Sequence, residues 1–398
     1  MGGSAARDGY AATGMTTVTH IVPLFAPVID GVGDYALKLA QTLRGGHSIN
    51  ARFVVADPSW RGPDQIDGFD VTGPTSFEKK RLFDAIRNES LVILHYVGYA
   101  FHPKGIPHWL IETLEGWQRL HPDATLITIF HEIWSSGPPW KSAFFLKSKQ
   151  RALVAHLLKI SRHSFVGTRS SLDRLNQIMA GKTSFLPVSA NVFPMREPTP
   201  HPRGSELFRP LIFGQPWTRR NAAKQHSEFL MALNRNRTLE RVFVMGKDAS
   251  QKVPSEEVII LKRAIPAEKI EVIGNASLIE AAGIFDQADF LLSPARPRDF
   301  CKSSAVMSAF ACGCPVAVSS QFANDDPAPL SSQHFIVAND SDCQVRYLES
   351  SPFQKWNLRR VATQARSWFL ENADWPVIGA KIAEKLRAVS GVEPHPKR

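Results

Sequence analysis

The sequence predicts an α/β protein built from two doubly wound parallel-sheet domains, and three observations support this fold class. Short apolar runs of strand length alternate with amphipathic stretches from Val18 onward, which is the pattern of parallel strands connected by helices. The chain has 398 residues, more than one ordinary hydrophobic core organises. Six prolines fall between Pro187 and Pro210, and this break separates two alternating halves.

The expected elements follow in chain order. Strands of the first half are expected over Val18–Phe25, Arg52–Ala56, Leu91–Tyr96, Leu126–Phe130 and Phe165–Gly167. Strands of the second half are expected over Leu211–Gly214, Arg241–Met245, Glu271–Ile273, Phe290–Leu292 and Phe335–Val337. Helices are expected over Tyr35–Leu43, Leu172–Met179, Lys224–Leu233 and Ser277–Gln287, and in a tail from Trp356 that is interrupted near Pro376.

Composition limits the classes of partner. Lys and Arg number 47 against 37 Asp and Glu, a net charge of +10, which suits an anionic ligand, nucleic acid or an anionic membrane surface. The absence of an arginine-rich block or RNA-binding signature argues against nucleic acid, and a solvated basic surface is the alternative to any partner. The four cysteines are interpreted as reduced, packed thiols of a cytoplasmic protein. No signal peptide or membrane span is predicted.

The stretch Ala288–Val318 reads as strand, loop, helix, turn and strand. Its helix is expected to open near Ser303 and to close at Gly313, which can adopt a left-handed conformation. The first turn would offer free backbone N–H groups beside the Ser303 and Ser304 hydroxyls and the Lys302 ammonium. This arrangement predicts an anion site, most naturally for phosphate. An ordinary serine-capped helix is the alternative.

Two loops of the first half are candidates for holding an acceptor. Gly31, Gly33 and Asp34 follow the first strand, and glycines there allow close backbone approach to a ligand, although a tight turn would use them too. The loop lacks the third glycine of a dinucleotide fingerprint. Tyr96 and Tyr99 follow the third strand, where they could stack on a sugar or ring or simply pack under the loop.

The pair His131 and Glu132 adjoins the end of the strand Leu126–Phe130. Burying two ionisable groups without a function is costly, so we interpret them as catalytic candidates that orient or deprotonate an acceptor hydroxyl. A metal site is not predicted, because no further His, Cys or Asp lies nearby at ligand spacing.

A cationic loop opens the second half. Gly214 ends the strand, Arg219 and Arg220 follow, and Lys224 lies one turn later. Arginines at such a position can meet a diphosphate bidentately. An exposed basic corner is the alternative.

These residues together resemble the GT-B glycosyltransferases, in particular the family 4 type that uses nucleotide-activated sugars. The resemblance is carried by the glycine loop, the His131–Glu132 pair, the Gly214 loop, Gly246 and Gly274, and most specifically by Ala311-Cys312-Gly313-Cys314-Pro315-Val316. It implies two Rossmann-like domains facing a central cleft. It also implies a diphosphate held by Arg219, Arg220 and Lys302 with Ser303 and Ser304, a base bordered by Gly246, Gly274 and Asn275, and His131 beside the reacting sugar.

The expected domains are a disordered leader (1–16), an acceptor-binding domain (17–190), a linker (191–209) and a nucleotide-sugar-binding domain (210–375). A final segment (376–398) is expected to cross back to the first domain. One departure from the family is clear: its two glutamates, eight residues apart, correspond here to Phe300 and Ser308, with Asp299 adjacent to the first.

The leading hypothesis is a glycosyltransferase of glycan biosynthesis that moves a sugar from a nucleotide diphosphate sugar to an acceptor hydroxyl. Retention of configuration follows from the resemblance. Metal and cofactor are not required, because side-chain cations and a helix N-terminus can stabilise the leaving group. The acceptor is left open between a glycan, a lipid-linked molecule and a small molecule. Peripheral contact of the protein with the inner membrane face is left open as well. The alternatives are a catalytically silent nucleotide- or glycan-binding subunit and, third, a Rossmann oxidoreductase or epimerase.

Overall fold

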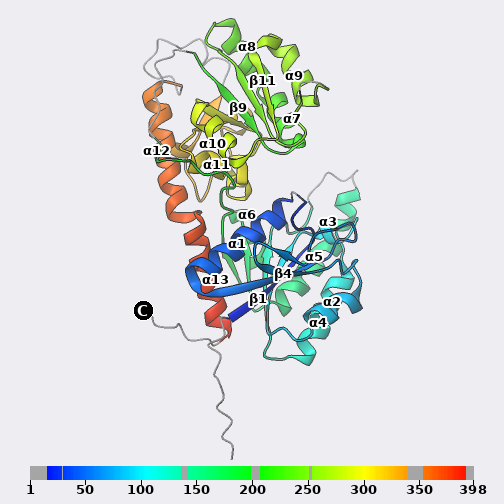
Figure 1. Cartoon of the computed structure of the whole chain (residues 1–398). Helices are drawn as coiled ribbons and strands as arrows, with labels where there is room; N and C mark the ends of the chain where they lie inside the picture. The colour runs from blue at the N-terminus through cyan, green and yellow to red at the C-terminus, as the bar shows by residue number, and fades with distance from the viewer. Residues whose placement is uncertain are drawn as a thin grey trace, which may run out of the picture. The chain divides into compact units, whose positions relative to one another are not determined.

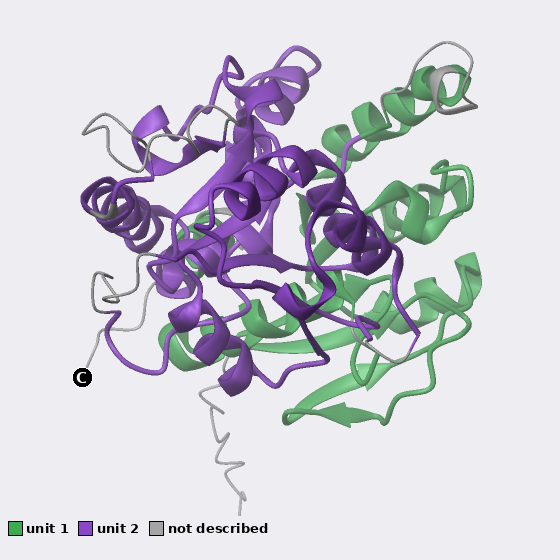
Figure 2. Cartoon of the chain, turned by 90° about the horizontal axis from the view of Figure 1, so that it is seen from above, with its two compact units in different colours: residues 1–129, 134–162, 379–398 green, residues 130–133, 163–378 purple. Residues whose placement is uncertain are grey.

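The structure is a computed structural model, and it describes residues 16–28, 30–135, 142–198, 207–250, 253–338 and 353–390. The chain divides into two compact units (Figure 2). The first comprises residues 1–129, 134–162 and 379–398, and the second comprises residues 130–133 and 163–378. The domain boundaries expected from the sequence lie at residues 190 and 375. The expected leader lies almost entirely outside the described residues.

The first sheet has eight strands in the order β3-β4-β2-β1-β5-β6-β7-β8. Their bounds are β1 Thr16–Val22, β2 Ile49–Val55, β3 Gln65–Ile66, β4 Phe69–Thr72, β5 Leu91–Tyr96, β6 Thr125–Phe130, β7 His163–Val166 and β8 Thr183–Phe185. Strand β1 pairs in parallel with β2 and β5, while β3 and β4 form an antiparallel edge. Strands β5 and β6 are buried along their whole lengths, which explains why the sequence predicted both closely.

The second sheet has six strands in the order β11-β10-β9-β12-β13-β14, and β9 and β11 of this sheet are labelled in Figure 1. The strands are β9 Pro210–Phe213, β10 Val242–Met245, β11 Ile270–Gly274, β12 Phe290–Ser293, β13 Val316–Ser319 and β14 Ile336–Ala338. All five pairings are parallel, so the carboxyl ends of all six strands meet at one edge. The predicted fold class, α/β with two parallel-sheet domains, is confirmed.

Helices connect the strands. Those of the first part of the chain are α1 Gly31–His47, α2 Lys79–Ile86, α3 Gly98–Phe101, α4 His108–Leu120, α5 Ser142–Ile160 and α6 Arg169–Asn176. Those of the second are α7 Pro216–Gln225, α8 Ser227–Arg235, α9 Glu256–Ala264, α10 Leu278–Gln287, α11 Ser304–Ala311, α12 Lys355–Asn372 and α13 Trp375–Ser390. The predicted interruption of the tail is the break between α12 and α13, with Pro376 in the first turn of α13.

Two apolar clusters enclose the second sheet, because successive side chains of a strand point to opposite faces. Leu211 of β9 belongs to the cluster that contains Phe285 of α10 and Phe310 of α11. Its neighbour Ile212 belongs to the cluster that contains Leu230 of α8 and Leu261 of α9. The parallel sheet is therefore covered on both faces, as a continuous apolar strand requires.

Three strands were not predicted, and each is short or lies at an edge. In β4 the residues alternate between buried and exposed, and its sequence FDVT holds only two apolar side chains. Strand β8 has three residues, two of them polar. Such segments carry too little apolar periodicity to stand out from a loop.

Among the described residues, no helix combines the length and apolar character needed to cross a membrane.

The C-terminal helix α13 contacts α1 within the first unit. A Cβ on Gly379 would lie 2.5 Å from Thr42 Cγ2, and Arg387 Nη2 donates a hydrogen bond of 3.2 Å to the carbonyl oxygen of His47. The tail thus returns to the unit that contains the N-terminal half of the chain, from Gly379 onward.

Candidate functional site

Three glycines end adjacent strands of the second sheet and are joined through their backbones. The Gly214 amide donates to the carbonyl of Met245 at 3.3 Å, and the Gly246 amide donates to the carbonyl of Gly274 at 3.0 Å. All three have positive φ, at 132°, 140° and 72°, where a side chain would be strained. They form one row of approachable backbone at the carboxyl edge of β9, β10 and β11, and Asn275 is exposed directly after it.

Arg219 lies under this row. Its side chain is 0% exposed, its Nε donates to Glu257 Oε1 at 2.7 Å, and its Nη1 donates to the carbonyl oxygen of Gly214 at 2.6 Å. Glu257 is a buried residue of α9 that the sequence did not single out. The predicted diphosphate ligand Arg219 therefore has its charge neutralised inside the second unit.

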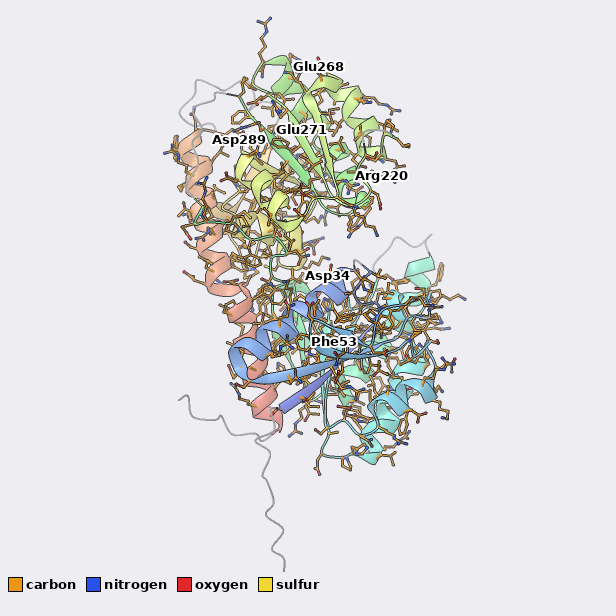
Figure 3. The ribbon with its side chains drawn as sticks, viewed as in Figure 1. Asp34, Phe53, Arg220, Glu268, Glu271 and Asp289 are labelled. Atoms are coloured by element: carbon orange, nitrogen blue, oxygen red, sulfur yellow. The ribbon has the colours of Figure 1, made fainter. Side chains whose placement is uncertain are left out.

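The other predicted cations are exposed, and most are paired. Arg220 (Figure 3) forms an ion pair of 2.9 Å with Glu256, with side chains 45% and 65% exposed. Lys302 lies 3.2 Å from Asp299. Lys224 is exposed in the last turn of α7. Arg220 and Lys302 can exchange a surface carboxylate for a ligand phosphate at small cost, because exposed ion pairs contribute little.

The helix after β12 begins and ends where the sequence predicted. Ser303 is the N-cap of α11, its side chain accepting a hydrogen bond of 3.4 Å from the Val306 amide, and Ser304 is the first helical residue. Gly313, just past the end, has a left-handed φ of 65°. The helix start is therefore capped by a neutral hydroxyl, which leaves its positive end available to an anion.

The two positions that lack glutamates carry structural roles. Phe300 is buried and packs edge-on against Phe310 and Phe335, with ring centroids 6.2 and 5.6 Å apart. The Ser308 hydroxyl accepts hydrogen bonds from the amides of Asn191 and Val192, both at 3.1 Å, and donates to the carbonyl of Ser304 at 2.7 Å. Phe300 thus fills the core, and Ser308 ties residues 191–192 to α11.

In the first unit, the start of α1 is occupied by a carboxylate. Asp30 caps the helix, and its Oδ2 accepts hydrogen bonds from the amides of Val32 and Gly33 at 3.1 and 2.9 Å. A Cβ on Gly33 would lie 2.5 Å from the Leu24 carbonyl oxygen, whereas Gly31 has open space. Burial and the neighbouring Asp30 raise the pKa of Asp34 (Figure 3) to about 6. This helix start disfavours phosphate and suits hydroxyl groups.

Tyr99 is held at the surface by a buried glutamine. Gln150 Nε2 donates to the Tyr99 hydroxyl at 3.1 Å and to the Lys104 carbonyl at 2.9 Å. The Ser135 amide donates to Gln150 Oε1 at 3.0 Å. Gln150 therefore connects the loop after β5 to the segment that follows β6. The sequence did not identify this residue, since a single glutamine in a helix carries no signal of such contacts.

A buried histidine pair lies between β1 and β5. His20 Nδ1 is 2.9 Å from His95 Nε2, and both residues are fully buried. Burial lowers the pKa of His20 to about 3. Tyr35 packs edge-on against His95, with the ring centroids 6.0 Å apart. Tyr35 is buried, and so is Tyr96 within β5. Burial raises the pKa of both phenols. Tyr96 is thus part of the core rather than of a surface platform.

His131 and Glu132 follow directly on β6. His131 is half-buried, and burial lowers the pKa of its imidazole to about 4 although the residue keeps some access to solvent. Glu132 is exposed. At neutral pH the imidazole is therefore uncharged, and one ring nitrogen can accept a hydrogen bond.

No protein-family model matches the chain, and no curated protein matches it in sequence. Its structure is similar to that of sucrose-phosphate synthase from Thermosynechococcus elongatus (14% identity, TM-score 0.65), covering 94% of this chain and 99% of the other. It is also similar to HepE from Anabaena, solved in complex with UDP-glucose (12% identity, TM-score 0.58), with 94% and 99% covered.

The fold is shared by an enzyme of another reaction class. A UDP-N-acetylglucosamine 2-epimerase matches with 11% identity and a TM-score of 0.53, covering 95% of this chain and 97% of that one. At such low identities the likenesses establish architecture rather than reaction. The chain has the GT-B fold of two Rossmann-like domains.

Proposed function

We propose that this protein transfers a sugar from a nucleotide diphosphate sugar to an acceptor hydroxyl. The observation that supports this best is the glycine row Gly214–Gly246–Gly274 at the carboxyl edge of a parallel sheet, the edge at which open α/β folds bind ligands. The start of α11 and Lys302 lie at the end of β12 in the same sheet. In the proposed site Gly246, Gly274 and Asn275 border the base, while Ser303, Ser304, Lys302 and Arg220 meet the diphosphate.

The acceptor is proposed to bind at residues that follow strands of the first sheet. Asp34 in the first turn of α1 offers a carboxylate, and Tyr99 in the short helix α3 after β5 offers a phenol; such groups hydrogen-bond sugar hydroxyls. His131 is proposed to orient or deprotonate the reacting hydroxyl as a neutral imidazole. Catalysis would then rest on positioning and on cationic stabilisation of the leaving diphosphate, without metal or cofactor and with retention of configuration.

A nucleotide-sugar panel tests the proposal. Thermal shift should show stabilisation by one nucleotide diphosphate and its sugar conjugate, since a ligand that binds only the folded state raises stability. Turnover with that donor, in EDTA and with NMR analysis of the anomeric product, tests metal independence and retention. Binding without turnover over broad acceptors would instead favour the silent subunit. Conversion of the free nucleotide sugar to its epimer would favour epimerisation.

Peripheral contact with an anionic membrane is a separate proposal, and helix α5 is its candidate surface. Residues 142–160 contain no Asp or Glu, Lys147, Lys149 and Arg151 are exposed, and Phe145 is 70% exposed. An apolar ring beside several cations is typical of helices that lie on anionic lipid. Sedimentation with vesicles of neutral lipid and with vesicles that contain anionic lipid should show binding to the anionic vesicles only. A Phe145→Ser variant should reduce it.

A further inference from the structure

The glycine row requires a rigid support, because its backbone has little room to vary. A Cβ placed on Gly246 would overlap the carbonyl oxygen of Gly214 and lie 2.8 Å from Arg219 Nη1. The Gly214 carbonyl, the Gly246 backbone and the Arg219 guanidinium are thus in mutual contact. A shift of any of the three would alter the surface that the row presents.

Arg219 connects three elements at this point. It belongs to α7, binds the carbonyl of Gly214 after β9, and pairs with Glu257 of α9. The side chains of the pair are 0% and 2% exposed, so solvent screens the interaction little. Its Nη2 has no hydrogen-bond partner among the described residues. A buried guanidinium is strongly held once paired, because leaving its partner carboxylate uncompensated is costly.

We propose that Arg219 and Glu257 are positioning residues that fix the conformation of the glycine row, and that Arg219 does not itself touch the diphosphate. This role rests on the proposed nucleotide site. Its basis is that the side chain is enclosed and that two of its three nitrogens are already bound inside the second unit. Of the two adjacent arginines, Arg220 is the one whose side chain is exposed and can meet phosphate.

The test replaces the pair together, since removal of one partner alone would leave a buried charge and could prevent folding. The variant Arg219→Met with Glu257→Leu keeps the volume and removes the bond to Gly214. A matched control is Arg209→Met with Asp289→Asn, which removes an ion pair of 3.5 Å at the opposite end of β9. Both variants are first checked for a cooperative thermal transition.

Hydrogen–deuterium exchange of the full chain without ligand gives the first readout. Peptides covering residues 211–220 and 242–250 should exchange at least about tenfold faster in the Arg219/Glu257 variant. The reason is that losing one hydrogen bond lowers the free energy of local opening by roughly the amount that makes exchange tenfold faster. In the control they should exchange as in the wild type. Unchanged exchange in a folded Arg219/Glu257 variant overturns the proposal, whatever the chain binds.

Titration with UDP and with uridine, followed by NMR, gives the second readout. Loss of positioning should weaken both ligands by the same factor, whereas loss of a direct phosphate contact should weaken UDP alone. Arg220→Met serves as the comparison, since it is expected to weaken UDP selectively. A selective loss of UDP binding in the Arg219/Glu257 variant would overturn the positioning role. If the wild-type chain binds neither ligand, the base of its donor is not uracil, and the exchange measurement still decides the role of Arg219.

Discussion

The carboxyl edges of the two sheets use different residues. In the second sheet β9, β10 and β11 end in glycines with positive φ, and the helix that follows β12 begins with a hydroxyl cap. In the first sheet His20, His95 and Tyr96 fill the corresponding strands, and α1 begins with the carboxylate of Asp30. Open backbone and a helix start capped only by a neutral hydroxyl suit a large anion, while a filled core and a carboxylate suit neutral hydroxyls. The contrast supports the proposal that donor and acceptor bind at different sheets.

The glycine-to-alanine substitution at Gly246 should have the largest effect, with Gly31 of the other edge as its control. Gly246→Ala places a methyl group against the Gly214 carbonyl at a φ of 140°, so we expect a loss of about 3 kcal/mol in unfolding free energy. Gly31→Ala meets no atom within 4 Å and should change stability by less than about 1 kcal/mol. Urea unfolding of both variants measures the difference. Equal stabilities would show that the glycine row is not tightly packed.

Buried histidines should make stability depend on pH. Burial lowers the pKa of His226, whose Nε2 lies 3.1 Å from the Ser293 carbonyl, to about 4. The unfolded chain takes up a proton near pH 6.5 while the folded chain stays neutral, so stability falls as pH falls from 6.5 toward 4. His226→Gln should remove about 2 kcal/mol of the decrease between pH 7.5 and 5. Urea midpoints at the two pH values measure it, and an unchanged pH dependence would refute the assignment.

The Lys302–Asp299 pair tests the donor side through binding. Lys302→Ala should weaken the nucleotide diphosphate by about 2 kcal/mol, as for a charge-assisted hydrogen bond. Asp299→Asn should leave affinity unchanged or raise it, because it frees the ammonium that lies 3.2 Å away. Calorimetry with the nucleotide identified by the panel provides the measurement. Unchanged affinity in Lys302→Ala would remove Lys302 from the donor site, and a loss of affinity in Asp299→Asn would mean that Asp299 itself contributes to binding.

Asp34 tests the acceptor side and should show the smallest effect. Because its pKa is raised to about 6, the folded state resists the charge, so Asp34→Asn should raise stability at pH 7 and not at pH 4.5. The kcat/KM of the Asp34→Asn variant at pH 7 should be about fivefold below that of the wild type, a loss of about 1 kcal/mol in transition-state stabilisation. The pH–rate profile of the wild type should show a limb near pH 6 that the variant lacks. Thermal melts and initial rates measure the two effects. A stabilised variant with unchanged kcat/KM would remove Asp34 from the acceptor site.

Alternation of strand and helix, the glycine strand ends and the limits of α11 could be predicted from the sequence alone. Each depends on a local rule: apolar period, the conformational freedom of glycine, or serine capping. Edge strand β4 and the contacts of Gln150 could not be predicted, since they depend on residues distant in the chain. Ser308 is a similar case, because its partners Asn191 and Val192 precede it by more than a hundred residues.

Arg219 and Arg220 show most clearly what could not be predicted from the sequence. Both were predicted to meet a diphosphate, because two arginines after a glycine strand end have the right charge at the right edge. Successive residues of an α-helix point about 100° apart, so one guanidinium enters the core beside Glu257 while the other reaches solvent beside Glu256. The sequence determined that cations gather at this edge. Only the packing of α7 against α9 decided which of them is enclosed and which is available to a ligand.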